Sequence, residues 1–151
     1  MSMALRICRF FLAAAAVATL AACSDSTDPD EHEVDVHSVT LTVGASSITI
    51  NRTTGAPSGE LTVPAGTSTV AATWRRANGT VEDEVTDAEF QLRIVPTNSA
   101  VLAFTAAGAF AGTLVTTGLL SGQSTTAAVS LFHPGEGHED FGPYTFTIRI
   151  Q

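Results

Sequence analysis

Residues 144–150 read Tyr-Thr-Phe-Thr-Ile-Arg-Ile. Apolar and polar side chains alternate strictly along this stretch, so an extended chain would carry its aromatic and aliphatic groups on one face. A period of two is typical of a β-strand that buries one face and exposes the other. We therefore predict that residues 144–150 form a strand that packs against a second sheet.

The same period recurs upstream, where turn residues separate the segments. Pro64-Ala65-Gly66 supplies one turn, and Asn78-Gly79 is the strongest hairpin signal in the chain. No segment beyond residue 22 has a useful length of helical periodicity, so the sequence predicts an antiparallel β-sandwich of about seven to nine strands. The apolar positions that we expect to face the core are Val39, Leu41, Val43, Ile48, Ile50, Leu61, Val63, Val70, Ala72, Trp74, Phe90, Leu92 and Ile94.

The stretch from residue 100 to residue 120, AVLAFTAAGAFAGTLVTTGLL, offers the main alternative to this fold. It is uncharged and long enough to cross a membrane as a helix. However, glycines interrupt it at turn-like intervals, and its many Thr and Val residues favour strands. We therefore expect two buried strands joined around Ala107-Gly108-Ala109.

The amino-terminal 22 residues have the features of an export signal. Arg6 and Arg9 form a basic start, and Phe10–Leu20 is an apolar run too short to span a bilayer. The tetrapeptide Leu20-Ala21-Ala22-Cys23 then resembles the lipobox of bacterial lipoproteins. This resemblance implies that residues 1–22 are removed as a signal peptide and that Cys23 becomes a lipidated amino terminus.

Lipidation at Cys23 would place the protein at the bacterial cell envelope, because two or three acyl chains anchor a protein stably in a membrane. Ser24 follows the cysteine, and by resemblance to the usual sorting pattern this residue favours the outer membrane over the inner one. Residues 24–37 are acidic and nearly devoid of apolar side chains. We expect residues 23–37 to form a flexible tether and residues 38–151 to form the folded domain.

Charge and cysteine content exclude several classes of function. The chain has 7 basic residues, all of them arginine, against 15 acidic residues. The few arginines beyond residue 22 are scattered and cannot form the basic stripe that nucleic-acid binding requires. Cys8 would leave with the signal and Cys23 would carry lipid, so the mature chain would have no disulfide and no catalytic cysteine.

Four segments of the expected domain follow one another as short strands and turns, and three of them contain glycine. They are Leu61–Trp74, Thr97–Phe104, Gly108–Gly112 and Gly118–Thr126. Their order resembles that of bacterial Ig-like domains of the invasin and intimin type, group two, over residues 61–131. An acidic insertion at residues 82–89 and a longer gap at residues 113–117 depart from that family's pattern. The resemblance implies a non-catalytic spacer or adhesion module.

The chain's 4 histidines are the candidate ligands for a transition metal. Two lie in the expected tether, and two lie in residues 132–143, which we interpret as a loop. The first and last strands of a sandwich commonly start at the same end, so we expect His37 to approach this loop. Imidazoles with nearby carboxylates suit zinc or copper, whereas a solvated loop without metal is the alternative. The candidate metal residues are His32, His37, His133, His138, Glu136, Glu139 and Asp140.

Enzyme motifs are missing from the sequence. It has no G-x-S-x-G elbow, no phosphate-binding G-x-x-x-x-G-K loop and no Rossmann fingerprint. The acidic pairs Glu82/Glu84 and Glu139/Asp140 are expected in exposed turns, where neither carboxylate is desolvated for acid–base catalysis. We predict a non-enzymatic, lipid-anchored envelope module that needs no cofactor and acts as a spacer or contacts an envelope or extracellular protein. The alternative is a small lipoprotein that binds zinc or copper.

Overall fold

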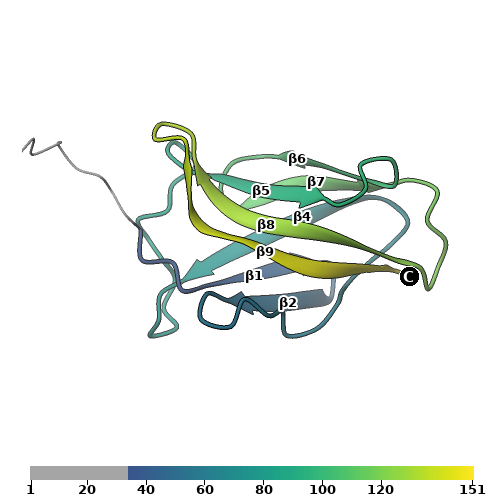
Figure 1. The fold of residues 1–151 in the computed structure, drawn as a ribbon, viewed down its shortest axis with the longest axis horizontal. Coiled ribbons are helices and arrows are strands. Elements are labelled where there is room, and N and C mark those ends of the chain that lie inside the picture. Colours follow the sequence, from purple (N-terminus) through teal and green to yellow (C-terminus); the bar gives the residue numbers. More distant parts are fainter. Residues whose placement is uncertain (1–33) are drawn as a thin grey trace, which may run out of the picture. The chain divides into compact units, whose positions relative to one another are not determined.

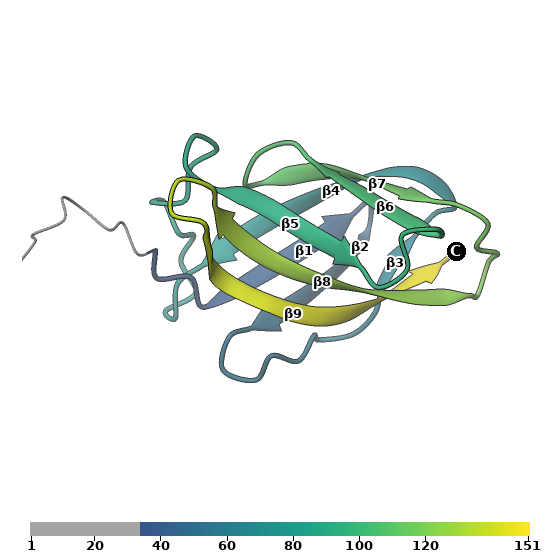
Figure 2. The ribbon, with the colours of Figure 1, turned by 45° about the horizontal axis from the view of Figure 1, so that its top comes forward.

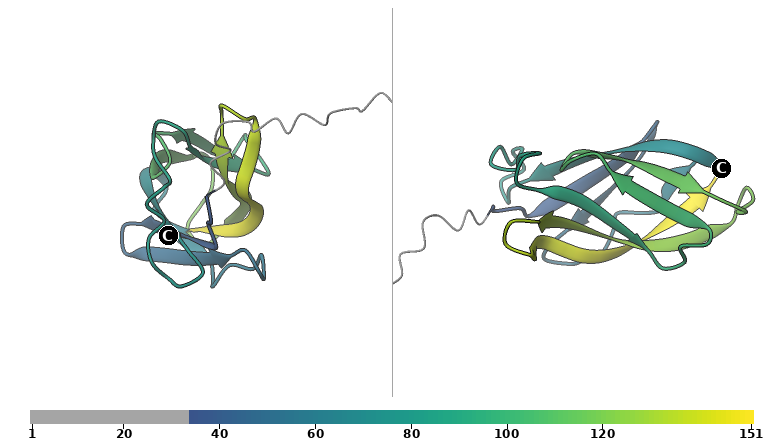
Figure 3. Two further views of the ribbon diagram at one scale, coloured as in Figure 1. Left: turned by 90° about the vertical axis from the view of Figure 1, so that its left-hand side faces the viewer. Right: turned by 90° about the horizontal axis from the view of Figure 1, so that it is seen from above.

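The computed structural model describes residues 34–151, which form 9 strands in two sheets packed face to face (Figures 1 and 3). The predicted all-β sandwich is therefore confirmed. No helix occurs within residues 34–151, and so none there could cross a membrane. The strands are β1 (Ser38–Val43), β2 (Ser46–Asn51), β3 (Leu61–Val63), β4 (Gly66–Arg75), β5 (Gln91–Pro96), β6 (Leu102–Ala106), β7 (Ala111–Thr116), β8 (Ser124–His133) and β9 (His138–Ile150).

The two sheets have the strand orders β2-β1-β4-β7-β6 and β3-β9-β8-β5. Neighbouring strands run antiparallel except β3 and β9, which are parallel, so the expectation of a purely antiparallel sandwich was wrong at this one pairing. We leave out β2 and β3 and renumber the other strands from 1 to 7 in chain order. The first sheet then has the strand order 1-2-5-4 and the second has the order 7-6-3. Constant-type immunoglobulin domains have this order, although their conserved tryptophan lies on the third strand and Trp74 lies on the second of these strands.

The core lies between the sheets and uses the apolar positions predicted from the alternating sequence. Phe146, Ile148 and Ile150 of β9 are buried, as are all the upstream positions named above. Trp74 is fully buried, and its indole Nε1 donates a hydrogen bond to the carbonyl oxygen of Ala109 (2.8 Å). Burial of each large aliphatic or aromatic side chain stabilises the fold by about 1.5–3 kcal/mol.

The apolar stretch at residues 100–120 forms the hairpin of β6 and β7, as the sequence predicted, and not a membrane-spanning helix. Each of the two strands buries only one face, however. Position 112 has to be glycine, because a Cβ atom there would collide with the ring of Phe104.

The folded domain begins earlier than predicted. Val34 and Val36 are buried in the core, although we placed them in the tether. The backbone of His37 also forms two hydrogen bonds with the first sheet. Its N–H donates to the carbonyl oxygen of Arg75 in β4, and its carbonyl oxygen accepts from the N–H of Arg52, which follows β2. Two valines in an acidic stretch were thus enough to fix residues 34–37 to the sandwich.

Residues 132–143 are not a loop, which is a second correction. β8 runs to His133 and β9 starts at His138, so most of the stretch belongs to a long hairpin. Its tip lies at the end of the sandwich where the described chain begins, opposite the carboxyl terminus (Figure 2). Register shifts between Val129 and Phe132 interrupt the pairing and conceal the strand period in the sequence.

Candidate metal centre

The β8–β9 hairpin places His133 and His138 directly opposite each other. They form the last paired residues before the turn at residues 134–137. The turn is closed by the N–H groups of Glu136 and Gly137, which donate to the carbonyl oxygen of His133 (3.2 and 2.8 Å). Gly137 has a φ of 76°, a left-handed conformation that glycine adopts without strain. The turn therefore folds Glu136 back toward the two histidines.

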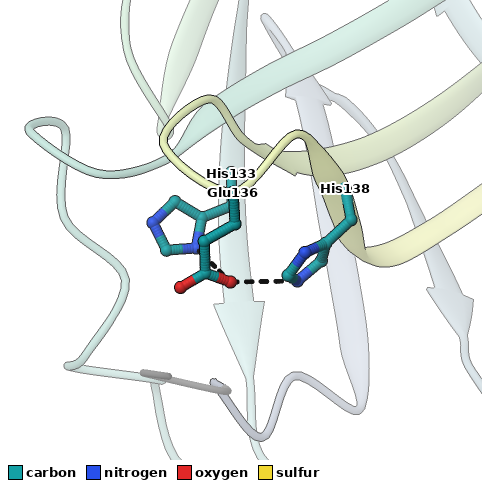
Figure 4. Close-up of side chains that lie close together, drawn as sticks. All are labelled: His133, Glu136 and His138. Atoms are coloured by element: carbon teal, nitrogen blue, oxygen red, sulfur yellow. Dashed lines mark ion pairs between the residues drawn. The ribbon is translucent and has the colours of Figure 1, made fainter. Parts of the chain in front are cut away.

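The carboxylate of Glu136 lies between the two imidazole rings (Figure 4). Its Oε2 atom is 3.4 Å from Nδ1 of His133 and 3.4 Å from Nε2 of His138. One ligand atom from each of the three residues lies within 4.8 Å of the other two. The ring centroids are 6.0 Å apart. Three potential ligands thus surround a single point at the hairpin tip.

These distances fit a small tetrahedral ion. Zinc binds nitrogen and carboxylate oxygen at about 2.0–2.2 Å, and a tetrahedron with bonds of about 2.0–2.1 Å separates neighbouring ligand atoms by about 3.3–3.4 Å. Both measured separations from Glu136 match this edge length. Two imidazoles and one carboxylate are also a known zinc ligand set. Zinc therefore fits the trio in donor type and in the two separations from Glu136.

His133 is a buried residue at the end of β8, so the alternative of a solvated loop does not describe it. Its side chain is 10% exposed, and its ring packs on Phe90 with a centroid separation of 4.7 Å. The Nδ1 atom is buried and has no hydrogen-bond partner within residues 34–151. This nitrogen faces the carboxylate of Glu136 at 3.4 Å, and both groups are donors that a metal ion can take as ligands.

Glu139 belongs to the opposite face of the hairpin and does not join the trio. Its carboxylate forms an ion pair with Nη1 of Arg93 (2.9 Å), whose guanidinium lies 4.3 Å from the ring centroid of Phe132. Successive residues of a strand point to opposite faces, so the start of β9 at His138 separates Glu139 from His138 and Asp140. Glu139 therefore lies outside the group of three converging ligands.

Asp140 shares the face of His138, and its Oδ1 atom is 3.4 Å from Nε2 of that histidine. Together with Val34, Arg52 and Glu139, these residues line a small open pocket beside the trio. Arg52 donates from Nη2 to the backbone carbonyl oxygen of Asp140. The role of Arg52 was missed, because nothing in the sequence links position 52 to position 140. The open pocket gives an ion a route from solvent to His138.

Of the two histidines that we expected in the tether, the structure describes His37 but not His32. His37 directly precedes β1, and its imidazole is not one of the three converging groups. His32 and Cys23 lie outside the described residues. The candidate centre in residues 34–151 thus comes from one hairpin alone.

The acidic pair Glu82/Glu84 also differs from expectation. Glu82 is fully buried and accepts hydrogen bonds from Nε and Nη2 of Arg76 (2.9 and 2.6 Å), whereas Glu84 is exposed. The hydrogen bond with Glu82 raises the pKa of Arg76, and the nearby acidic side chains add to this rise. Because its charge is already neutralised by a bidentate arginine, Glu82 is not available as a metal ligand.

Comparisons with protein-family models, with curated proteins and with solved structures gave no match to this chain.

Proposed function

We propose that this protein is an exported β-sandwich that binds one divalent transition-metal ion through His133, Glu136 and His138. The observation that carries this proposal is the convergence of the three ligand atoms at the tip of the β8–β9 hairpin. The tetrahedral spacing favours zinc over copper(II), because copper(II) prefers tetragonal sites. Two imidazoles and a carboxylate on one short turn are a ligand set that zinc accepts.

The proposed location is the cell envelope, with lipidation at Cys23 and the outer membrane as the preferred site. This part of the proposal rests on the lipobox resemblance of residues 20–23. In this arrangement residues 24–33 connect the anchor to a metal-binding domain that starts at Val34. The hairpin tip lies at the same end of the domain as Val34 (Figure 2).

A second candidate is an Ig-like spacer or interaction module, which the immunoglobulin-type strand order favours. The two candidates make different predictions about zinc. A spacer gains no stability from the ion, whereas a protein with a dissociation constant of about 1 µM gains about 2.7 kcal/mol at 100 µM free zinc. For a domain of this size, that gain raises the melting temperature by roughly 10 °C.

Zinc-dependent thermal melting tests the proposal. The wild-type protein and the His37→Ala variant should both show the rise, since His37 lies outside the trio. The His133→Ala/His138→Ala double variant should show none. His138→Ala alone should also lose most of the rise, and its side chain is 47% exposed, so this variant leaves the core intact. An unchanged melting temperature in the wild type, or an equal rise in the double variant, would overturn the metal function.

A further inference from the structure

We infer that Asp140 supplies a fourth ligand, so that four protein side chains enclose the metal ion. This inference rests on the proposed metal function and specifies it: a closed shell holds the ion, whereas a three-ligand site presents an open position to a substrate. The protein would then store, carry or be stabilised by the ion instead of using it for catalysis.

The first observation is an unbalanced buried carboxylate. The side chain of Asp140 is 4% exposed, and its Oδ2 atom has no hydrogen-bond partner within the described residues. Taking a charged carboxylate out of water is costly unless a cation or several hydrogen bonds compensate it. A bound cation at this place provides that compensation.

The second observation is that the nearest arginine does not supply this charge. Arg52 directs its Nη2 donor to the backbone carbonyl oxygen of Asp140. Among residues 34–151, His138 is the basic side chain that lies within 4.0 Å of the Asp140 carboxylate. Arg52 thus holds the backbone of Asp140 in place and leaves the carboxylate free for another partner.

The third observation is the spacing. Oδ1 of Asp140 lies 3.4 Å from Nε2 of His138, which equals the separation between that nitrogen and Glu136. This again matches the edge of about 3.3–3.4 Å expected for a tetrahedral zinc ion. Glu136 reaches the nitrogen from the turn and Asp140 reaches it from the strand. Asp140 lies outside the group whose atoms share 4.8 Å, so the ion has to draw its carboxylate toward the other three.

Charge balance supports four ligands over three. Two neutral imidazoles and one carboxylate would leave a zinc site with one net positive charge beside a buried, negatively charged Asp140. Including the second carboxylate brings the charge of the enclosed ion and its ligands to zero. A neutral cluster is the arrangement that costs least when a site is partly removed from water.

Binding of cobalt(II) in place of zinc tests this inference, because the visible absorption of bound cobalt(II) depends on the number of its ligands. We expect the wild-type protein to give the intense absorption of a four-coordinate site, and millimolar azide to leave that spectrum unchanged. The Asp140→Asn variant should bind cobalt at least tenfold more weakly, and azide should change its spectrum. The matched control is Glu139→Gln, which removes the same charge from the adjacent residue and should behave as the wild type.

Two results would overturn the fourth ligand while the proposed metal function stands. One is a wild-type spectrum that azide alters or that has the weak absorption of five or six ligands. The other is an Asp140→Asn affinity within about twofold of the wild type. If neither cobalt nor zinc binds the wild-type protein at all, the proposed function fails together with this inference.

Discussion

Glu82 and Asp140 are both buried carboxylates, with side-chain exposures of 0% and 4%, but they differ in what balances their charge. Glu82 accepts two hydrogen bonds from Arg76. The carboxylate of Asp140 forms no ion pair with an arginine in the described chain, and its Oδ2 atom has no hydrogen bond there. Burial alone therefore does not mark a functional carboxylate. The carboxylate of Glu82 is already neutralised by the guanidinium of Arg76, so it serves the fold and is not free to bind an ion.

The largest effect that we expect from this comparison is at Glu82. Replacement by Gln removes the charge that neutralises Arg76 and breaks a bidentate pair in the interior. Hydrogen bonds to charged groups contribute about 1.5–3 kcal/mol, so the free energy of unfolding should fall by about that amount. Urea denaturation without metal measures it. Zinc affinity should stay unchanged, and a loss of zinc binding would place Glu82 in the metal centre after all.

At Asp140 we expect the free energy of unfolding to change in the opposite direction. In the metal-free protein, Asp140→Asn replaces a buried unpaired charge by a neutral amide of the same shape, which is less costly to bury. The free energy of unfolding should rise by about 1 kcal/mol. The same urea experiment at neutral pH checks the sign, and lower stability in this variant would show that the carboxylate is already satisfied without an ion.

The smallest effect is expected at Glu139. Its ion pair with Arg93 lies on the outer face of the hairpin, with side-chain exposures of 34% and 41%. Exposed pairs of this kind contribute about 0–1 kcal/mol. Glu139→Gln should therefore change the unfolding free energy by less than about 0.5 kcal/mol. A larger loss would mean that the hairpin depends on its outer face as much as on its inner one.

The regular strands were predictable from the sequence because their side chains alternate without interruption. Val39, Leu41 and Val43 in β1, and Phe146, Ile148 and Ile150 in β9, all point into the core as expected. Local alternation is sufficient in β1 and β9 because each of these strands buries a single face. The hairpin in residues 100–120 was predictable for another reason, because its glycines mark turns and its Thr and Val residues favour strands.

The candidate site was only partly predictable. Residue types identified His133, His138 and Glu136, but the hairpin that joins them was interpreted as a loop, since glycines, a proline and the register shifts break the period of two. Without the strand, nothing separates Glu139 from Asp140. The pairing of Glu82 with Arg76 was missed for a different reason, because burial of a carboxylate depends on packing that no local pattern shows.

The most direct test of a cation site at the β8–β9 hairpin is calorimetric titration of zinc into the purified protein. We predict one zinc ion per chain with a dissociation constant of micromolar order or lower, and no such binding in the His133→Ala/His138→Ala variant. Absence of heat in the wild type, or equal binding by the variant, would contradict the account and leave the hairpin as a structural element of the sandwich.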